Sequence, residues 1–538
     1  MKRLVVAGFM AGALVCVAAW GQAGVPPKFE AADVSVAPYR VQAFGNGGQL
    51  HGDRYIWHQA TLLDLISAAY GVDADLVQGG PSWLERDRFE IIGKADPKTS
   101  QATLKLMLRS LLASRFELKM HEGEKPMPTY WLTVGKTGKP KLKQSAGEGT
   151  EGCDPEQQPP ASAGVVVPFG LKCHDMTMES LASTLRNYAS DYLDKPVIDK
   201  TGLEGAWDFE FKWMSKGALQ RAGADGISIF DAVDKQMGLK LELQTSPQKV
   251  WLVDNADRKP TPNASDIAKI LPPLPPPVFD VAIIKPSAPD ERSNARINGG
   301  QVNVQALPLK FMVSFAWDLN PNSNDNVINP PKWFNESKFD IIAKAAAVDG
   351  PAQPGAPAAT IDIEDLRTMI KAFIAERFNM QYHMEDRPIP AYTLYAGTPK
   401  MRKADPASRT KCYEGPGPDG KDPRIANPIL GRLLTCQNMS MAEIADELQR
   451  VAGGYIYGTV LDKTELTDRY DFTLSFSSIG QLNSSTPQNN GSGESSDPSG
   501  GLSLYDAVSK QLGLKLVKEK RPMPVLVIDH IDDKPTEN

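Results

Sequence analysis

Two stretches of the chain decide the architecture because each of them occurs twice. GGPSWLERDRFEIIGKA (79–95) returns as NPPKWFNESKFDIIAKA (329–345), and ISIFDAVDKQMGLKLEL (227–243) returns as LSLYDAVSKQLGLKLVK (502–518). Shorter matches between them keep the same order, such as MTMESLASTL (176–185) with MSMAEIADEL (439–448). A repeat of about 250 residues is far too long for a solenoid unit. We therefore predict a tandem duplication of a whole domain.

The boundary between the copies is marked by proline. The segment ASDIAKILPPLPPP (264–277) favours an extended, semi-rigid linker. We predict a first copy over residues 24–263 and a second over 278–538. Loops of low complexity interrupt the copies at 144–168, 349–359, 413–428 and 480–501.

Helical and strand patterns alternate inside each copy, which predicts an α+β fold. TLLDLISAAYG (61–71) has apolar residues at helical spacing, and Thr61 with Asp64 forms a capping-box pattern. The same entry pattern recurs at Ser228/Asp231, Ser440/Glu443 and Ser503/Asp506. Another amphipathic helix is expected around Leu104–Leu112.

Runs of β-branched and aromatic residues predict the strands. They lie at 88–95, 116–122, 129–135, 207–213, 239–243 and 250–254. The run at 116–135 is expected to be a hairpin, as is its equivalent at 378–396. The two halves of a copy have similar patterns, so each copy is predicted to contain two small α+β subdomains.

The first residues resemble an export signal. Lys2 and Arg3 precede an apolar run, Leu4–Ala19, and small residues offer a cleavage site near Gly24. We expect residues 1–23 to be a signal peptide, with a retained anchor as the alternative, and no stable membrane span after cleavage. The protein would then be periplasmic or secreted.

Charge and composition exclude some partners. The chain of 538 residues is 41% hydrophobic and 23% charged, an ordinary globular composition. Without Lys2 and Arg3, the 59 basic residues fall to 57 against 65 acidic ones. This balance does not attract nucleic acid or an anionic membrane surface.

The four cysteines after the signal segment form two equivalent pairs. Cys153 and Cys173 precede MTMESLA, and Cys412 and Cys436 precede MSMAEIA. Matched pairs in an exported protein predict the disulfides Cys153–Cys173 and Cys412–Cys436. A zinc site is the alternative, but His174 after Cys173 has Gln437 as its counterpart.

Four residues are candidates for a ligand or partner surface. His121 and His383 occupy equivalent positions, as do Trp83 and Trp333. A solvated histidine at the end of a strand and a tryptophan that anchors a core are the competing interpretations. No nucleophile repeats beside the histidines, and the sequence contains no His-Glu-x-x-His, Gly-x-Ser-x-Gly, Walker or Rossmann signature. We assign no catalytic residue, metal or cofactor.

The quoted motifs resemble a family of exported soil-bacterial proteins, abundant in acidobacteria, that is catalogued only as a domain of unknown function. The resemblance covers almost the whole mature chain. It departs where Tyr70-Gly71 of the first copy becomes Trp317-Asp318 in the second. Similar domains occur fused to BlaR-type membrane peptidase regions, which implies envelope sensing. The short helix-and-strand units also resemble, more distantly, the small N-terminal domains of secretins and TonB-dependent receptors, which are binding and signalling modules.

These observations favour a non-enzymatic periplasmic binding or envelope-signalling module with an unidentified envelope protein as its partner. A hydrolase acting on cell-wall or carbohydrate substrates is the alternative. Edge strands of the expected hairpins, 116–135 and 378–396, are plausible docking surfaces through strand addition. Two similar bodies on a stiff tether are expected to bind a repeated partner more tightly than either copy alone.

The linker predicts that residues 25–263 and 278–538 fold separately. Each segment should express alone and unfold cooperatively, because few contacts are expected to cross a proline-rich boundary. Circular dichroism and thermal unfolding of the two segments check this. An insoluble or molten segment beside a compact full chain would show that the copies share a core.

Overall fold

The computed structural model describes residues 26–40, 43, 47–136, 138–147, 150–156, 167–222, 226–288, 290–298, 300–345, 361–417, 419–427, 429–485 and 500–537. The expected signal peptide lies outside the described residues, as do large parts of the low-complexity loops. Contacts divide the chain into two compact units, residues 1–120 with 253–538 and residues 121–252. The predicted boundary between the copies, where a short helix α6 (Ile267–Ile270) lies within the expected linker, stays a prediction.

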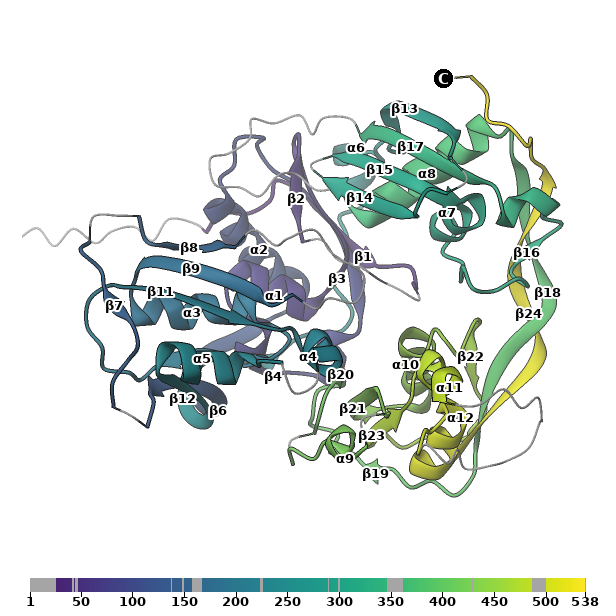
Figure 1. The fold of residues 1–538 in the computed structure, drawn as a ribbon. Helices are drawn as coiled ribbons and strands as arrows, with labels where there is room; N and C mark the ends of the chain where they lie inside the picture. The colour runs from purple at the N-terminus through teal and green to yellow at the C-terminus, as the bar shows by residue number, and fades with distance from the viewer. Residues whose placement is uncertain are drawn as a thin grey trace, which may run out of the picture. The chain divides into compact units, whose positions relative to one another are not determined.

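Four hydrophobic cores confirm the α+β fold and the two subdomains expected in each copy. In the first copy, one core surrounds Leu62 and Phe116 and another surrounds Phe211 and Leu239. In the second copy, one core surrounds Leu309 and Phe378, and the other surrounds Leu434 and Leu516. Each core lies between a four-stranded sheet and its helices (Figure 1).

The first copy builds its two sheets in the same strand order. Its first subdomain has the order β1-β5-β3-β2, and its second has β7-β11-β9-β8. The elements are β1 (Ala32–Val36), β2 (Gln49–His51), β3 (Arg54–Thr61), α1 (Leu62–Tyr70), β5 (Arg88–Lys94) and α2 (Gln101–Arg115), followed by β7 (Lys143–Gln144), β8 (Gly152–Pro155), β9 (Phe169–Met176), α3 (Met178–Tyr188), β11 (Trp207–Trp213), α4 (Lys216–Ala222) and α5 (Ile229–Met237).

The second copy repeats this scheme with sheets β13-β17-β15-β14 and β19-β23-β21-β20. Its elements are β13 (Phe279–Pro286), β14 (Asn294–Asn298), β15 (Gln301–Pro308), α7 (Leu309–Ala316), β17 (Lys338–Ala345) and α8 (Ile363–Arg377), followed by β19 (Arg402–Lys403), β20 (Lys411–Glu414), α9 (Pro423–Ala426), β21 (Arg432–Met439), α10 (Met441–Val451), β23 (Tyr470–Phe476), α11 (Ile479–Ser485), α12 (Leu504–Ala507) and η5 (Val508–Leu512). Short 3-10 turns η1 (Ala74–Leu76), η2 (Ser82–Glu85) and η4 (Lys332–Asn335) complete the chain.

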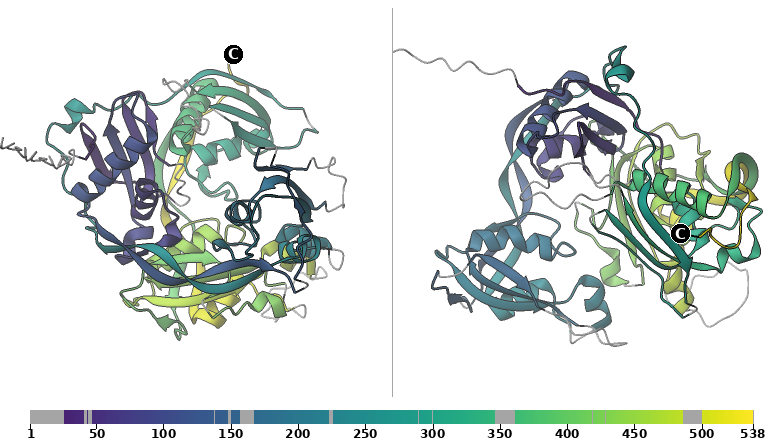
Figure 2. Two further views of the ribbon diagram at one scale, coloured as in Figure 1. Left: turned by 90° about the vertical axis from the view of Figure 1, so that its left-hand side faces the viewer. Right: turned by 90° about the horizontal axis from the view of Figure 1, so that it is seen from above.

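A long two-stranded ribbon joins the subdomains of each copy. It consists of β6 (Lys119–Val134) with β12 (Leu239–Asn255) in the first copy, and of β18 (Gln381–Ala396) with β24 (Leu514–His530) in the second. Strands β18 and β24 pair antiparallel from Gln381↔His530 to Ala396↔Leu514. Figures 1 and 2 show the two long strands, green and yellow, side by side. Short strands β4 (Val77–Gly79), β10 (Val197–Asp199), β16 (Val327–Ile328) and β22 (Val460–Asp462) extend the ends of these ribbons.

The predicted hairpins at 116–135 and 378–396 are wrong, because each is one continuous strand. The predicted pair of strands at 239–243 and 250–254 is likewise the single strand β12. The hairpins on which docking edges were expected are therefore absent, although β22 covers β18 only at Tyr392–Leu394. Docking by strand addition along these segments stays a prediction.

The prolines of these segments fit a continuous ribbon. Pro388 pairs with Pro522, and Pro390 and Pro524 follow two residues along their strands. Residues two apart in an antiparallel strand direct their N–H groups to the same side. The flanking strands β22 and β16 pair only further along, at Tyr392–Leu394 and Leu526–Val527. The prolines thus occupy the unpaired side of a two-stranded segment, where a missing N–H costs little.

A β-bulge opposite a carboxylate recurs in all four subdomains. In β3, His58 and Gln59 together oppose the single residue Glu90 of β5, because the register shifts between Trp57 and Ala60. The second bulge residue has a positive φ in every case, and its N–H donates to the opposing carboxylate: Gln59 (54°) to Glu90 at 3.2 Å, Asp175 (51°) to Asp208 at 3.1 Å, Ala306 (49°) to Asp340 at 2.9 Å and Asn438 (51°) to Asp471 at 2.9 Å.

The bulge leads directly into the first helix of each subdomain. In each subdomain the N-cap residue lies two residues after the bulge; these residues are Thr61, Thr177, Pro308 and Ser440. The capping boxes predicted at Thr61/Asp64 and Ser440/Glu443 are confirmed, and Ser228 and Ser503 also cap their helices through the backbone three residues on. The bulge increases the local bend. The side chains of Thr61, Thr177 and Ser440 accept from an N–H of the first helical turn, whereas Pro308 makes no such bond.

The part of the chain that the structure describes contains no helix with the length and hydrophobicity of a membrane span.

The Asp208→Ala variant tests the bulge contact, because it removes the acceptor of the Asp175 N–H. We expect the local unfolding free energy around residues 170–185 to fall by about 1–3 kcal/mol, the cost of an unsatisfied backbone donor. Native-state hydrogen exchange measures this locally. The Asp208→Asn variant keeps a side-chain oxygen and should lose less, so equal losses in the two variants would contradict this role.

Candidate functional site

A cavity among the described residues is lined mainly by the second copy, with Tyr39 of the first copy also on its wall. It has a volume of about 700 Å³ and opens between sheet β13-β17-β15-β14, helices α7 and α8, and the middle of the β18/β24 ribbon. Apolar side chains such as Val302, Ile341, Met312 and Phe373 form most of its wall. Residues at the end of α10 and in the following loop, including Gln449 and Tyr457, also line it. Volume and lining are those of a small-molecule site.

The two copies differ where this cavity lies. Relative to the bulge, Val302 and Val304 occupy the positions of Tyr55 and Trp57 in the first copy. Tyr55 and Trp57 are only 5% exposed, and both belong to the core of the first subdomain. Valine is much smaller than either aromatic residue, so the second copy has space where the first has rings.

Three nearly buried polar side chains line the cavity with an unused atom. Ser314 is fully buried, and Asn326 and Arg367 are each 7% exposed. Their Oγ, Oδ1 and Nε atoms have no hydrogen-bond partner among the described residues, although Arg367 Nε lies 3.7 Å from Glu364 Oε1 in an ion pair. The Oε1 atom of Gln449, which also lines the cavity, likewise has no hydrogen-bond partner among the described residues. Buried polar atoms are normally paired, so ordered water or a bound molecule would be expected to complete their hydrogen bonds.

An internal ion pair balances the charge inside the cavity. Arg367 Nη1 lies 3.1 Å from Asp318 Oδ1 and also donates to the Phe315 carbonyl. In the first copy, Gly71 stands at the position of Asp318 and Lys105 at the position of Arg367. Gly71 ends α1 with a φ of 65°. Asp318 keeps the positive φ, at 55°, and adds a carboxylate for the arginine. The Tyr-Gly to Trp-Asp change noted in the sequence therefore forms a new buried pair.

A second cluster of titratable groups surrounds His58. Its Nδ1 contacts Glu90 Oε2, and its Nε2 lies 4.0 Å from Asp365 Oδ1. Burial lowers the pKa of His58, but the hydrogen bond and charge of Glu90, with the charges of Asp362 and Asp365, raise it to about 9. Burial lowers the pKa of nearby His51 and raises those of Asp362 and Asp365. The protonated His58 thus neutralises a partly buried acidic group.

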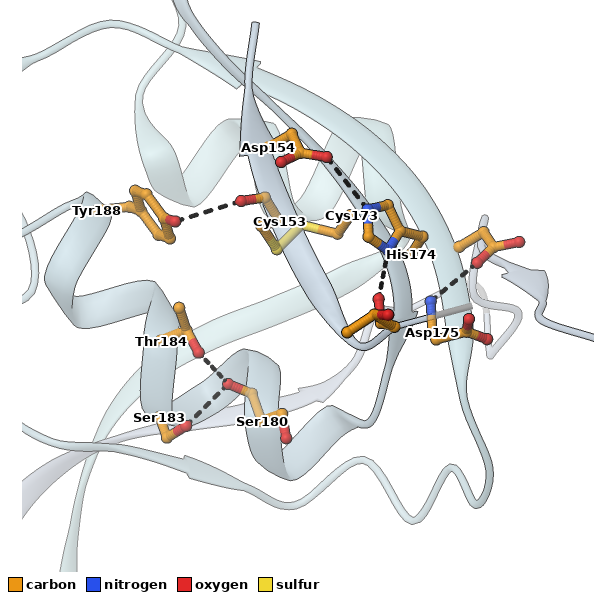
Figure 3. Close-up of a disulfide and its surroundings, with 11 residues drawn as sticks. Cys153, Asp154, Cys173, His174, Asp175, Ser180, Ser183, Thr184 and Tyr188 are labelled. Atoms are coloured by element: carbon orange, nitrogen blue, oxygen red, sulfur yellow. Dashed lines mark hydrogen bonds and ion pairs between the residues drawn. A yellow bond between two sulfur atoms is a disulfide. The ribbon is translucent and has the colours of Figure 1, made fainter. Parts of the chain in front are cut away.

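Both predicted disulfides are present, one in each copy. The Cα atoms are 4.0 Å apart in Cys153–Cys173 and 4.1 Å apart in Cys412–Cys436, and each bond joins two neighbouring strands. Because all four thiols are used, the zinc alternative loses its cysteine ligands. In Figure 3, His174 beside Cys173 contacts Asp154 at 3.2 Å and the Thr150 carbonyl at 2.8 Å, and the hydrogen bond to Asp154 raises its pKa.

The four residues proposed from sequence lie outside the lining of the cavity. Trp83 packs against the first-subdomain core, with its ring 6.4 Å from that of Phe89, and Trp333 packs likewise, 6.3 Å from Phe378. His121 is exposed near the start of β6 rather than at a strand end. His383 is also exposed, and the hydrogen bond to Asp529 at 2.9 Å raises its pKa. Their role as a partner surface stays a prediction.

Sequence reasoning missed the cavity, although the signal was present. The loss of bulk at Val302 and Val304 becomes visible once these residues are aligned with Tyr55 and Trp57. That alignment requires the bulge register, because the β3 and β15 segments share almost no residues.

The pKa of His58 predicts a stability that depends on pH. A folded pKa of about 9, above the ordinary 6.5, means that the stabilisation is complete below pH 6.5 and disappears as pH rises through 9. The His58→Gln variant, which copies Gln305 of the second copy, should melt at a lower temperature than wild type at pH 6. The difference should vanish above pH 9.

Differential scanning fluorimetry across this range makes the measurement. Glu90→Gln removes the acidic partner of His58 and also weakens the bulge contact to the Gln59 N–H, so its difference in melting temperature from wild type should shrink toward pH 9 without vanishing. If the difference in melting temperature between wild type and His58→Gln stays constant from pH 6 to pH 10, the stabilisation does not come from protonated His58.

A comparison with known families identifies the family of this chain. Residues 63–256 and 310–531 match the family described as a protein of unknown function, DUF3738, and the two matches together cover more than half of the chain. No curated protein and no solved structure matched the chain. One match falls in each copy, as expected for the duplication. The chain therefore belongs to the DUF3738 family and carries that domain twice.

Proposed function

We propose that the protein is an exported, non-enzymatic binding protein of the cell envelope whose second copy holds a small, largely apolar molecule. The observation that carries the proposal is the cavity of about 700 Å³ walled by apolar side chains. Clefts of this size hold most small-molecule ligands, with a few polar groups fixing the orientation of the bound molecule.

The apolar character of the cavity extends to its helical wall. Phe311 and Phe315 of α7 stand at the positions of Asp64 and Ala68 in the first copy. Phe311 is 41% exposed, and Ile297 on the facing strand β14 is 39% exposed. An apolar ligand would remove these surfaces from water, which supplies roughly 25 cal/mol for each Å² covered.

The disulfides support the proposed location. Cys153–Cys173 and Cys412–Cys436 are stable in oxidising compartments such as the periplasm or the exterior of the cell. A periplasmic binding protein would report its ligand to an envelope partner, and the two copies on one chain suit a repeated or dimeric partner.

Filling the cavity tests the proposal. Val304→Trp and Val302→Tyr restore the residues of the first copy, which already accommodates them at these positions. Titration of the neutral dye Nile red into wild type should give saturable fluorescence, and either variant should weaken this binding at least about tenfold by occluding the site. Val281→Trp, on an exposed residue of the opposite sheet face, is the matched control.

Two results would overturn the proposal. Equal dye binding by wild type and Val304→Trp would place any ligand elsewhere. Turnover of peptidoglycan or a glycan by the purified protein would replace the binding function with the hydrolase alternative.

A further inference from the structure

The unused polar atoms of the cavity specify the ligand more closely. Three of them are oxygens, Ser314 Oγ, Asn326 Oδ1 and Gln449 Oε1, and none has a hydrogen-bond partner among the described residues. The two amide oxygens can only accept, whereas the Ser314 hydroxyl can accept or donate. They come from separate elements, α7, the segment before β16, and α10. A molecule in the cavity therefore meets acceptors on more than one side.

The orientation of Asn326 is fixed by its other contacts. Its side-chain nitrogen donates to the Asn320 carbonyl at 3.0 Å, and its backbone carbonyl accepts from the Leu526 N–H at 2.9 Å. Since the nitrogen is engaged, the opposite atom of the amide must be the oxygen. Asn326 thus presents an acceptor that only an N–H or O–H group can satisfy.

The charges nearest these atoms are already balanced. Arg367 pairs with Asp318 at 3.1 Å, and Arg450 donates to Glu447 at 3.1 Å. Arg296 lines the rim on β14, where it is exposed to solvent. An ionised group buried beside the unpaired oxygens would add an uncompensated charge, which is costly in an apolar site.

We propose, on the basis of the binding function above, that the ligand is a neutral amphipathic molecule with an apolar body and a hydrogen-bond donor such as an amide or hydroxyl group. The apolar body lies against Val302, Val304 and Ile341. The donor group lies toward Asn326, Ser314 and Gln449.

Four probes with the same chain separate the relevant chemistries. Dodecanamide and dodecanol carry donors, methyl dodecanoate carries only acceptors, and dodecanoate is an anion. We expect the amide and the alcohol to displace Nile red from the full-length mature protein at concentrations about five- to tenfold lower than the ester, the difference typical of one buried hydrogen bond. Dodecanoate should bind no more tightly than the amide.

Matched variants assign the preference to individual oxygens. Gln449→Met removes an acceptor with little change of shape and should reduce the preference for amide over ester. Ser314→Ala removes a hydroxyl that can bind either probe, so it should weaken the binding of both. Ser67→Ala is the control, because Ser67 is the first-copy equivalent of Ser314, and its hydroxyl also lacks a partner among the described residues.

The outcomes distinguish this inference from the proposed function. If the ester binds as tightly as the amide while Val304→Trp still abolishes binding, the site is real but the donor requirement is wrong. A preference that persists unchanged in Gln449→Met would also overturn the inference. Tighter binding of dodecanoate that is lost in Arg296→Gln would assign an anionic ligand instead.

Discussion

The hydrogen bond between a bulge N–H and an opposing carboxylate supports each of the four subdomains. It holds a non-glycine residue at a positive φ, fixes the register of the two central strands and places the helix cap two residues later. A one-residue slip at this point would reverse the faces of the following strand, so the carboxylate determines which side chains reach the core. The same device in every subdomain shows that a copy consists of two structurally similar halves.

The copies nevertheless use this shared framework differently. In the first copy, Trp57 and Tyr55 fill the space between sheet and helices. In the second, Val304 and Val302 leave that space open, while Phe311 and Phe315 enlarge the apolar wall. Lost core volume is destabilising when nothing replaces it. The buried pair Arg367–Asp318 and the unpaired oxygens beside it are further features that a bound molecule would account for.

Local signals in the sequence predicted much of the fold. Helices α1 and α10 begin at the expected capping boxes, the strands at 88–95 and 207–213 are confirmed within a residue, and matched cysteine positions predicted both disulfides. The ribbons were missed because Pro126 and Pro388 indicate turns when a strand is assumed to be paired on both sides. The cavity was missed because a valine in place of a tryptophan has no consequence until the register shows that both occupy the same core position.

The position of a bound ligand tests the central claim most directly. Methyl NMR of the full-length protein, labelled at isoleucine, valine and methionine and titrated with dodecanamide, reports every wall of the cavity. The account predicts that shifts concentrate at Val302, Val304, Met312 and Ile341, and that Ile91 and Ile66 in the first copy stay unchanged. Equal shifts in the two copies, or shifts confined to the exposed outer residues Val281 and Ile342, would contradict it.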